Sequence, residues 1–219
     1  MESSLVTWFT LQGSRSGDGT NFFPIIVCSI EVYMKDIWNE LTAWTDTGKP
    51  FSLARVVKTW RSAPRAAGAG MIVGPNMEVA GSVSGGCIEG AVIEEALDVL
   101  KGGTPRKLIY GVEDELALSV GLSCGGEVSV FVEKHWAFAE QQETRAVWER
   151  LRQALKNNEP AVLLSKIETS GDPPMLVLPE EATLGNWKHL QDRAWELALE
   201  AYRSRENRLA ELEGVEVFI

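Results

Sequence analysis

The chain has 219 residues, 45% of them hydrophobic, and 31 acidic against 21 basic side chains give it a net charge of −10. A surface this acidic repels phosphate backbones, so nucleic acid is not an expected partner. No apolar run approaches the roughly 18 residues of a membrane span, and three widely spaced cysteines do not make the disulfide framework of a secreted protein. We therefore expect a soluble, cytoplasmic α/β protein.

Residues 1–33 differ in composition from the rest of the chain. A Gly/Ser-rich stretch at 11–21 precedes the apolar run 22–30, which contains Cys28, expected to be structural at most. This run could form an extra edge strand. It could also be upstream sequence from an over-extended reading frame, the interpretation that we favour, because Met34 opens a regular amphipathic pattern. No basic segment precedes the run, so a secretory signal is not expected.

From Met34 onward the sequence alternates between helical and extended patterns. Ile37, Leu41 and Trp44 share one face of a helix that the Gly48–Pro50 turn ends. The other elements expected in this half are strands at 51–58, 71–73, 78–80, 106–110 and 127–133, and a helix whose apolar positions are Ile88, Val92, Ala96 and Val99 or Leu100.

The second half repeats this order of elements. We expect helices at 142–156 and 187–205 and strands at 161–167, 174–178 and 215–219. The sequence therefore predicts duplicated αββα-type halves, 34–134 and 135–219, that form a mixed sheet flanked by helices. Only the first half carries a Gly/Cys loop before its second helix, because Gly185–His189 stands in its place in the other copy. Because only one half carries this loop, we expect one site, beside a helix N-terminus.

The stretch Gly81–Gly90 is the strongest candidate for that site. Its glycines let backbone N–H groups approach a ligand closely, and a helix N-terminus adds unpaired donors and the positive end of a dipole. Cys87 falls in or just before the first helical turn, where the dipole favours thiolate over thiol. The structural alternative is a glycine-rich strand-to-helix turn that contains a small buried cysteine.

A second cysteine lies beside a glycine pair in Ser123–Gly126. If the two loops converge, Cys87 and Cys124 face one concavity that suits a soft or metal-bearing ligand with an anionic group. A structural zinc site is not expected, because the sequence has no Cys-x-x-Cys. His135 and His189, the two histidines, are not near the cysteines in sequence and are expected at the surface or at strand ends.

Two charged side chains could serve the same site. Arg65, in the loop that begins at Ser62, could pair with a phosphate through its two-pronged guanidinium, although a lone loop arginine is more often solvated. Glu89 could hydrogen-bond a ligand amine or cap its own helix, and capping is the commoner role.

Three motifs, Ser62–Arg65, Gly81–Glu89 and Cys124–Gly126, resemble in order and separation those of the XdhC/CoxI family of molybdenum hydroxylase accessory proteins. The similarity runs from about Met34 to Ile219. It implies a maturation chaperone, not an enzyme, that binds molybdenum cofactor (molybdopterin), protects it while an oxo ligand is exchanged for sulfide, and delivers it to a xanthine or carbon monoxide dehydrogenase. It also implies a homodimer that docks to a cysteine desulfurase or to the target hydroxylase.

The resemblance also implies which residues bind the cofactor: Ser62, Arg65, Ser82, Ser84, Gly85, Gly86, Cys87, Glu89, Cys124, Gly125 and Gly126. In this interpretation glycine N–H groups and Arg65 take the terminal phosphate. Cys87 or Cys124 contacts the molybdenum or holds a sulfur in transit, and the sequence leaves open which does which.

Two features depart from the family pattern. Family members commonly have glycine where this chain has Arg61, and many continue into a C-terminal Rossmann domain, which we do not expect in a sequence that stops at Ile219. Two other functions stay open. One is an enzyme in which Cys87 and Cys124 cycle through persulfide or disulfide states. The other is a non-catalytic interaction module whose acidic face docks a basic partner.

Overall fold

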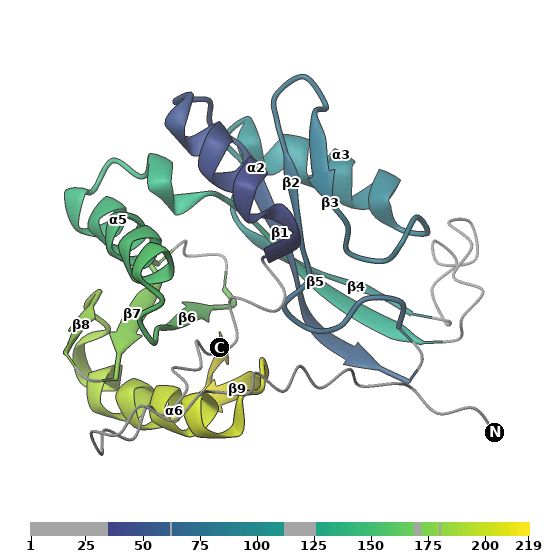
Figure 1. Cartoon of the computed structure of the whole chain (residues 1–219). Helices are drawn as coiled ribbons and strands as arrows, with labels where there is room; N and C mark the ends of the chain where they lie inside the picture. The colour runs from purple at the N-terminus through teal and green to yellow at the C-terminus, as the bar shows by residue number, and fades with distance from the viewer. Residues whose placement is uncertain (1–34, 62, 112–125, 169–171, 180) are drawn as a thin grey trace, which may run out of the picture.

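The computed structural model describes residues 35–61, 63–111, 126–168, 172–179 and 181–219, which form two five-stranded sheets with helices between and outside them (Figure 1). The strand considered for the apolar run 22–30 lies outside these residues, as does Cys28. The proposed division at residues 33 and 134 stays a prediction.

The first half contains the helices and strands that were expected from the sequence, and its strands form the first sheet. They are α2 (Lys35–Asp46), β1 (Ser52–Trp60), β2 (Gly70–Val73), β3 (Val79–Gly81), α3 (Glu89–Leu100), β4 (Arg106–Tyr110) and β5 (Glu127–Lys134). The strand order is β3-β2-β1-β5-β4. Helix α3 therefore carries the chain across the whole sheet, from one edge strand to the other.

The second sheet repeats the first. Its elements are η1 (Trp136–Phe138), α5 (Gln142–Asn157), β6 (Val162–Lys166), β7 (Met175–Leu178), β8 (Ala182–Leu184), η2 (Lys188–Leu190), α6 (Gln191–Ser204), β9 (Leu209–Leu212) and β10 (Val215–Phe218). The order β8-β7-β6-β10-β9 matches the first sheet strand for strand. The α/β class and the duplication are thus confirmed, and the short strands β8 and β9 were missed.

The expectation of one mixed sheet is corrected. Each half closes its own sheet, and the strand pairs of both sheets are antiparallel wherever the structure describes them. The reason lies in the crossover. Because α3 spans the full width of its sheet, β4 arrives beside the antiparallel β5 and not beside β3, with which it would have been parallel.

Helices α2 and α5 fill the space between the two sheets (Figure 1). Ile37 and Leu41 of α2 are fully buried, as their spacing predicted, and share a core with Trp148 of α5 and with the facing strands β1, β2, β6 and β7. The rings of Trp38 and Trp148 lie 5.4 Å apart where the helices meet. On the opposite faces, α3 covers the first sheet and α6 the second.

Beyond these helices the two sheets contact each other directly. Phe131 of β5 and Phe218 of β10 share a small buried cluster. Beside it, Arg55 donates a 2.6 Å hydrogen bond to Glu133, and both side chains are buried. Burial raises the pKa of Glu133, which the charge of Arg55 opposes. Removing either partner would leave an unpaired buried charge, so the pair stabilises the packing of β1 against β5 within the first half.

Candidate functional site

The glycine loop lies between the edge strand β3 and helix α3. Gly85 and Gly86 have φ angles of +83° and +120°, which L-residues rarely adopt. A Cβ added at Gly86 would meet nothing within 4 Å, so this glycine is required for its backbone angle and not for packing. Both glycines are exposed, and the loop therefore presents its backbone to solvent.

The carboxylate of Glu89, the first residue of α3, is enclosed by this loop. Its Oε1 accepts hydrogen bonds from the hydroxyl of Ser82 (2.6 Å) and from the N–H groups of Val83 (3.3 Å), Ser84 (2.9 Å) and Gly85 (3.0 Å). Its Oε2 accepts from the hydroxyl of Ser84 and from the N–H of Gly86 (2.8 Å). Six donors thus converge on one side chain.

The backbone donors expected to hold a phosphate are therefore bonded to the protein's own carboxylate. Burial by itself would raise the pKa of Glu89, but the hydrogen bonds from Ser82 and Ser84 outweigh it and lower the pKa to about 2. Of the two roles considered for Glu89, the structure shows the intramolecular one. It ties the loop to the start of its own helix.

Cys87 is held by the same network. Ser84, which is almost fully buried, accepts hydrogen bonds at its Oγ from the N–H groups of Cys87 and Ile88, each 3.1 Å long. The Cys87 thiol is free and half-buried, and it packs against the core beneath α3. The residue thus lies just before the first helical turn, as predicted, with a fixed backbone and a partly exposed sulfur.

The Arg65 loop lies beside the glycine loop. The Cβ of Pro64 lies 3.6 Å from the position that a Cβ would take at Gly85, and Ala63 packs against the same core as Cys87. Arg65 itself forms a 3.0 Å ion pair with Asp36 of α2, and its Nε has no partner among the described residues. Two of the three motifs are thus brought together.

Most of the third motif lies outside the described residues, because they include neither Cys124 nor Gly125. Gly126 is buried and precedes β5, whose first residue Glu127 pairs with Trp60, two residues before the Arg65 loop begins at Ser62. Ser62 also lies outside. The convergence of Cys87 with Cys124, and any contact of the two with molybdenum, stays a prediction.

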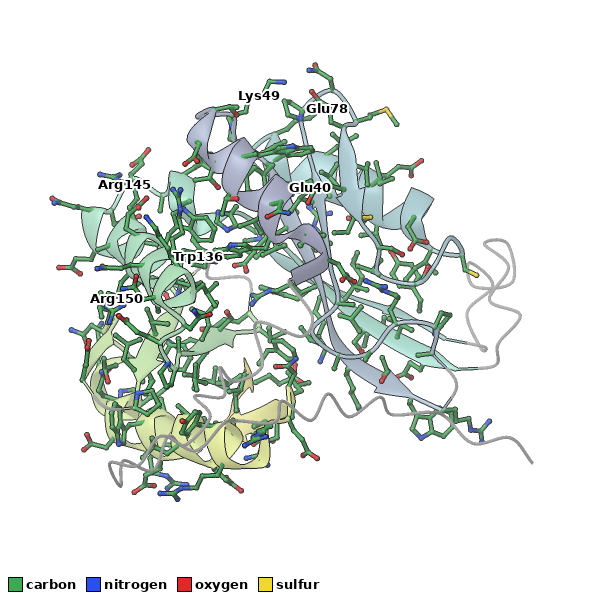
Figure 2. All side chains as sticks on the ribbon, viewed as in Figure 1. Glu40, Lys49, Glu78, Trp136, Arg145 and Arg150 are labelled. Carbon is green, nitrogen blue, oxygen red and sulfur yellow. The ribbon has the colours of Figure 1, made fainter. Side chains whose placement is uncertain are left out.

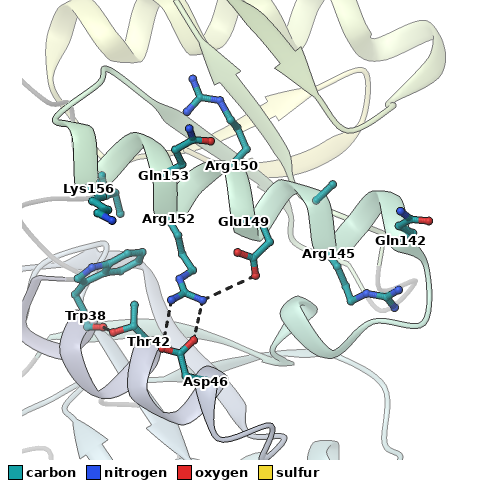
Figure 3. Close-up of a pocket in the computed structure, with 12 residues that line it drawn as sticks. Trp38, Thr42, Asp46, Gln142, Arg145, Glu149, Arg150, Arg152, Gln153 and Lys156 are labelled. Carbon is teal, nitrogen blue, oxygen red and sulfur yellow. Dashed lines mark hydrogen bonds and ion pairs between the residues drawn. The ribbon is translucent and has the colours of Figure 1, made fainter.

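A groove of about 1040 Å³ between α2 and α5 was not anticipated (Figure 3). Arg145, Glu149, Arg152 and Lys156 of α5 line it, and Arg152 crosses it to bond Asp46 of α2 at 2.8 and 3.3 Å. The spacing of the α5 residues places them on one helix face and was visible in the sequence. The helix that became α2 was also predicted, but not that it would pack beside α5.

His135 was expected at the surface or at a strand end. It directly follows β5, but it is buried, with its ring stacked on Trp136 at 4.9 Å. Its Nδ1 accepts the N–H of Ala137, which places the ring proton on Nε2. Burial and the nearby charge of Arg55 lower the pKa of His135 to about 3, so the ring is neutral and part of the core.

Two kinds of feature are absent from the described ranges. No helix there combines the length and apolar character needed to cross a bilayer. No three His, Cys, Asp or Glu side chains there are grouped so that they could hold a metal ion.

Residues 44–111 match the model of the XdhC and CoxI family. This match confirms the resemblance. The segment includes the Arg65 loop and the whole Gly81–Gly90 stretch. The third motif and the second half of the chain lie beyond it.

Two curated relatives extend this comparison. Over 137 residues the chain is 31% identical to a probable xanthine dehydrogenase subunit of Bacillus subtilis, a match that covers 62% of this chain and 39% of the relative. Over 107 residues it is 35% identical to the molybdenum cofactor insertion chaperone PaoD of Escherichia coli, covering 49% and 32%. The chain thus spans well under half the length of these relatives.

The fold also has a solved counterpart. The crystal structure of a xanthine dehydrogenase from Bacillus halodurans superposes with a TM-score of 0.58 over 73% of this chain and 47% of that one. The sequence identity is 24%, so this likeness shows the fold alone.

Proposed function

We propose that this chain binds molybdenum cofactor and assists its sulfuration and insertion into a xanthine dehydrogenase-type molybdenum hydroxylase. The observation that carries the proposal is the proximity of the Arg65 loop to the glycine loop, where Pro64 lies beside Gly85, so that a guanidinium-bearing loop borders the loop with the half-exposed thiol. The family match and the names of the relatives support this role. A cysteine desulfurase as sulfur donor, a homodimer and a cytoplasmic location belong to the same proposal.

The residues present fit such cargo in part. Molybdopterin offers a phosphate and a dithiolene-bound metal, and a soft thiol such as Cys87 suits the metal. The Arg65 guanidinium is partly exposed, and its surface ion pair with Asp36 is exchangeable, so a phosphate can replace that carboxylate. The loop N–H groups do not fit the phosphate while Glu89 occupies them. We therefore assign the phosphate to Arg65.

Protein purified from cells that make molybdopterin tests this assignment. We expect wild-type protein to carry a pterin that is released by acid and detected by fluorescence. Cys87→Ser and Arg65→Ala should each reduce the pterin content at least about tenfold, as expected for the loss of a metal contact or of a charge-assisted pair. The readout is pterin per mole of folded protein.

Two matched variants serve as controls. Cys28→Ser removes a thiol outside the family motifs, and Arg152→Ala removes a guanidinium from the α2–α5 groove. Both should keep the wild-type pterin content. If Cys87→Ser and Arg65→Ala also keep it, or if Arg152→Ala alone loses it, the cargo does not lie at these loops.

A further inference from the structure

The far end of β1 presents an exposed tryptophan. Trp60 is 53% exposed, and Ile109 of the edge strand β4 is 52% exposed. Trp60 pairs with Glu127 and Ile109 with Ser129, two residues further along β5, so both side chains leave the same face of the sheet. We call Lys58, Trp60, Arg61 and Ile109 the Trp60 patch.

Arg61 has an unusual backbone. Its φ of +58° lies in the left-handed region that glycine adopts freely and other residues adopt at a cost. Its guanidinium carbon lies 4.0 Å from the centre of the Trp60 ring, a cation–π distance. This contact holds the indole in one orientation while leaving it exposed, which lowers the entropy that Trp60 would lose on binding a partner.

The patch is positively charged on an acidic protein. Lys58 and Arg61 are exposed, and neither has a carboxylate partner within the described part of the chain. By contrast, the nearby Lys107 and Arg208 are neutralised by Glu216 and Glu200. Glu127, the strand partner of Trp60, places one carboxylate on the same face, so the two cations leave the patch with a net positive charge. An exposed tryptophan beside this charge complements an acidic surface, and tryptophan and arginine are enriched among the residues that dominate protein interfaces.

The surroundings of the patch favour a protein partner. A cleft of about 470 Å³, lined in part by Lys58, Thr59 and Leu209, opens next to it and can take a protruding side chain. Arg61 also directly precedes the motif whose Pro64 lies beside Gly85. A protein bound at the patch would therefore lie beside the loops that we assign to the cargo.

We propose that the Trp60 patch docks an acidic surface of the hydroxylase that receives the cargo. This inference rests on the proposed function, because the cargo defines which partner must come close. Electrostatic attraction between the patch and that acidic surface brings the two proteins together in one orientation. The sign is the opposite of the acidic docking face considered from the sequence.

Binding of the purified, cofactor-free xanthine dehydrogenase of the same organism tests the inference by biolayer interferometry. We expect Trp60→Ala to weaken binding at least about tenfold, as for a central interface tryptophan. Met77→Ala is the control. Met77 is 64% exposed and has a φ of +64°, but it lies in the β2–β3 turn, which Lys49 and Glu78 hold at the far end of the sheet (Figure 2). It should change binding less than about twofold.

Arg61→Gly separates docking from stability. Glycine relieves the left-handed backbone, so the midpoint of thermal unfolding should stay equal or rise by about 2 °C. Binding should nevertheless weaken about fivefold, because the guanidinium is gone. Raising the salt concentration should weaken the binding of the wild-type protein. The Lys58→Glu variant should bind more weakly from the start, and its affinity should depend less on the salt concentration. Unchanged binding in both Trp60→Ala and Arg61→Gly would overturn the inference.

The pterin content of the same variants keeps the two proposals apart. Trp60→Ala and Arg61→Gly should carry wild-type amounts of pterin and fail only in docking. If Cys87→Ser retains its pterin, the cargo assignment fails whatever the docking result. If Trp60→Ala leaves hydroxylase binding unchanged but converts a dimer of this chain into a monomer on size-exclusion chromatography, the patch binds a second copy and our proposal is wrong.

Discussion

The two halves of the molecule make the same strand-to-helix connection with different residues. In each, the chain leaves a short edge strand at a glycine and enters the helix that covers the sheet. Gly81 and Gly185 have φ angles of +84° and +93°. A Cβ on either would lie within 2.7 Å of a backbone oxygen, that of Gly70 in the first half and of Pro174 in the second. This glycine therefore belongs to the fold.

Beyond the glycine both loops are tied to the first residue of the next helix. In the second half Gln191 accepts one hydrogen bond, 3.0 Å long, from the N–H of Trp187. In the first half Glu89, at the equivalent helix position, accepts six. These hydrogen bonds between the loop and the helix are structural in both halves. The first half needs a charged acceptor, because its longer loop turns more N–H groups inward.

The halves differ most in what fills the loop. Trp187 is 3% exposed, and its indole N–H donates to the carbonyl of Pro173, so the second loop is closed by a large side chain. The first loop has the small Cys87 at its helix entrance and exposed glycines before it. What the fold does not require of the first loop, namely the thiol and the exposed backbone, is what remains for function.

The largest expected difference is in unfolding free energy. Trp187→Ala should cost about 3–5 kcal/mol, because it empties a buried site. Cys87→Ala should cost about 1 kcal/mol or less, because the thiol is small and half-buried. Urea unfolding of both variants measures the two costs. Equal costs would mean that Cys87 is a packing residue, as Trp187 is.

The two connecting glycines should be equally intolerant. Gly81→Ala and Gly185→Ala should each cost about 2–3 kcal/mol, since both combine a left-handed backbone with a clash against backbone atoms. Gly214→Ala is the control, because its φ is +86° but a Cβ there meets nothing within 4 Å, and it should cost only about 1 kcal/mol. A cost at Gly81 no greater than at Gly214 would contradict the shared requirement.

The acceptors Glu89 and Gln191 should differ in pH dependence. The folded pKa of Glu89, about 2, lies below the ordinary value of 4.5, so its stabilisation is complete above pH 4.5 and is lost as the pH falls towards 2. Glu89→Gln should cost about 1–2 kcal/mol at pH 7 and flatten this part of the stability profile. Gln191→Glu should change stability by less than about 0.5 kcal/mol. If Glu89→Gln leaves the pH dependence of the unfolding free energy unchanged, the hydrogen bonds accepted by Glu89 do not stabilise the loop.

The smallest effect concerns a glycine that neither loop needs. Gly90 lies in α3, and a Cβ there would meet nothing within 4 Å. Gly90→Ala should stabilise the protein by about 0.5 kcal/mol, because alanine loses less backbone entropy in a helix. Destabilisation, measured by the same urea method, would show that the helix entrance tolerates no added side chain.

Regular periodicity made much of the fold predictable. The buried face of α2 and the alternation along β5 were read correctly, because each spans enough residues to show its period. The strands β8 and β9 are as short as β2 and β3, but they lack the consecutive β-branched residues that mark β2 as a strand. The mixed sheet was wrong because strand pairing depends on the path of α3, which periodicity does not reveal.

The candidate site was predictable only as a set of residues. Spacing located Cys87 and Glu89 at a helix entrance, yet the glycine N–H groups looked free, because no sequence rule says that six donors meet one carboxylate. The buried pair of Arg55 and Glu133 joins residues 78 positions apart. A charged residue within an apolar strand predicts that its side chain is buried, but the sequence does not reveal which residue forms the ion pair with it.

The most direct test of the account is the alkylation rate of Cys87 with and without bound cargo. Protein that carries molybdopterin, and the same protein after the cofactor is removed, would be treated with iodoacetamide and analysed by mass spectrometry of the peptide containing Cys87. The account predicts that bound cofactor slows modification of Cys87 at least about tenfold and leaves Cys28 unaffected. Equal rates at Cys87 with the cofactor demonstrably bound would contradict it.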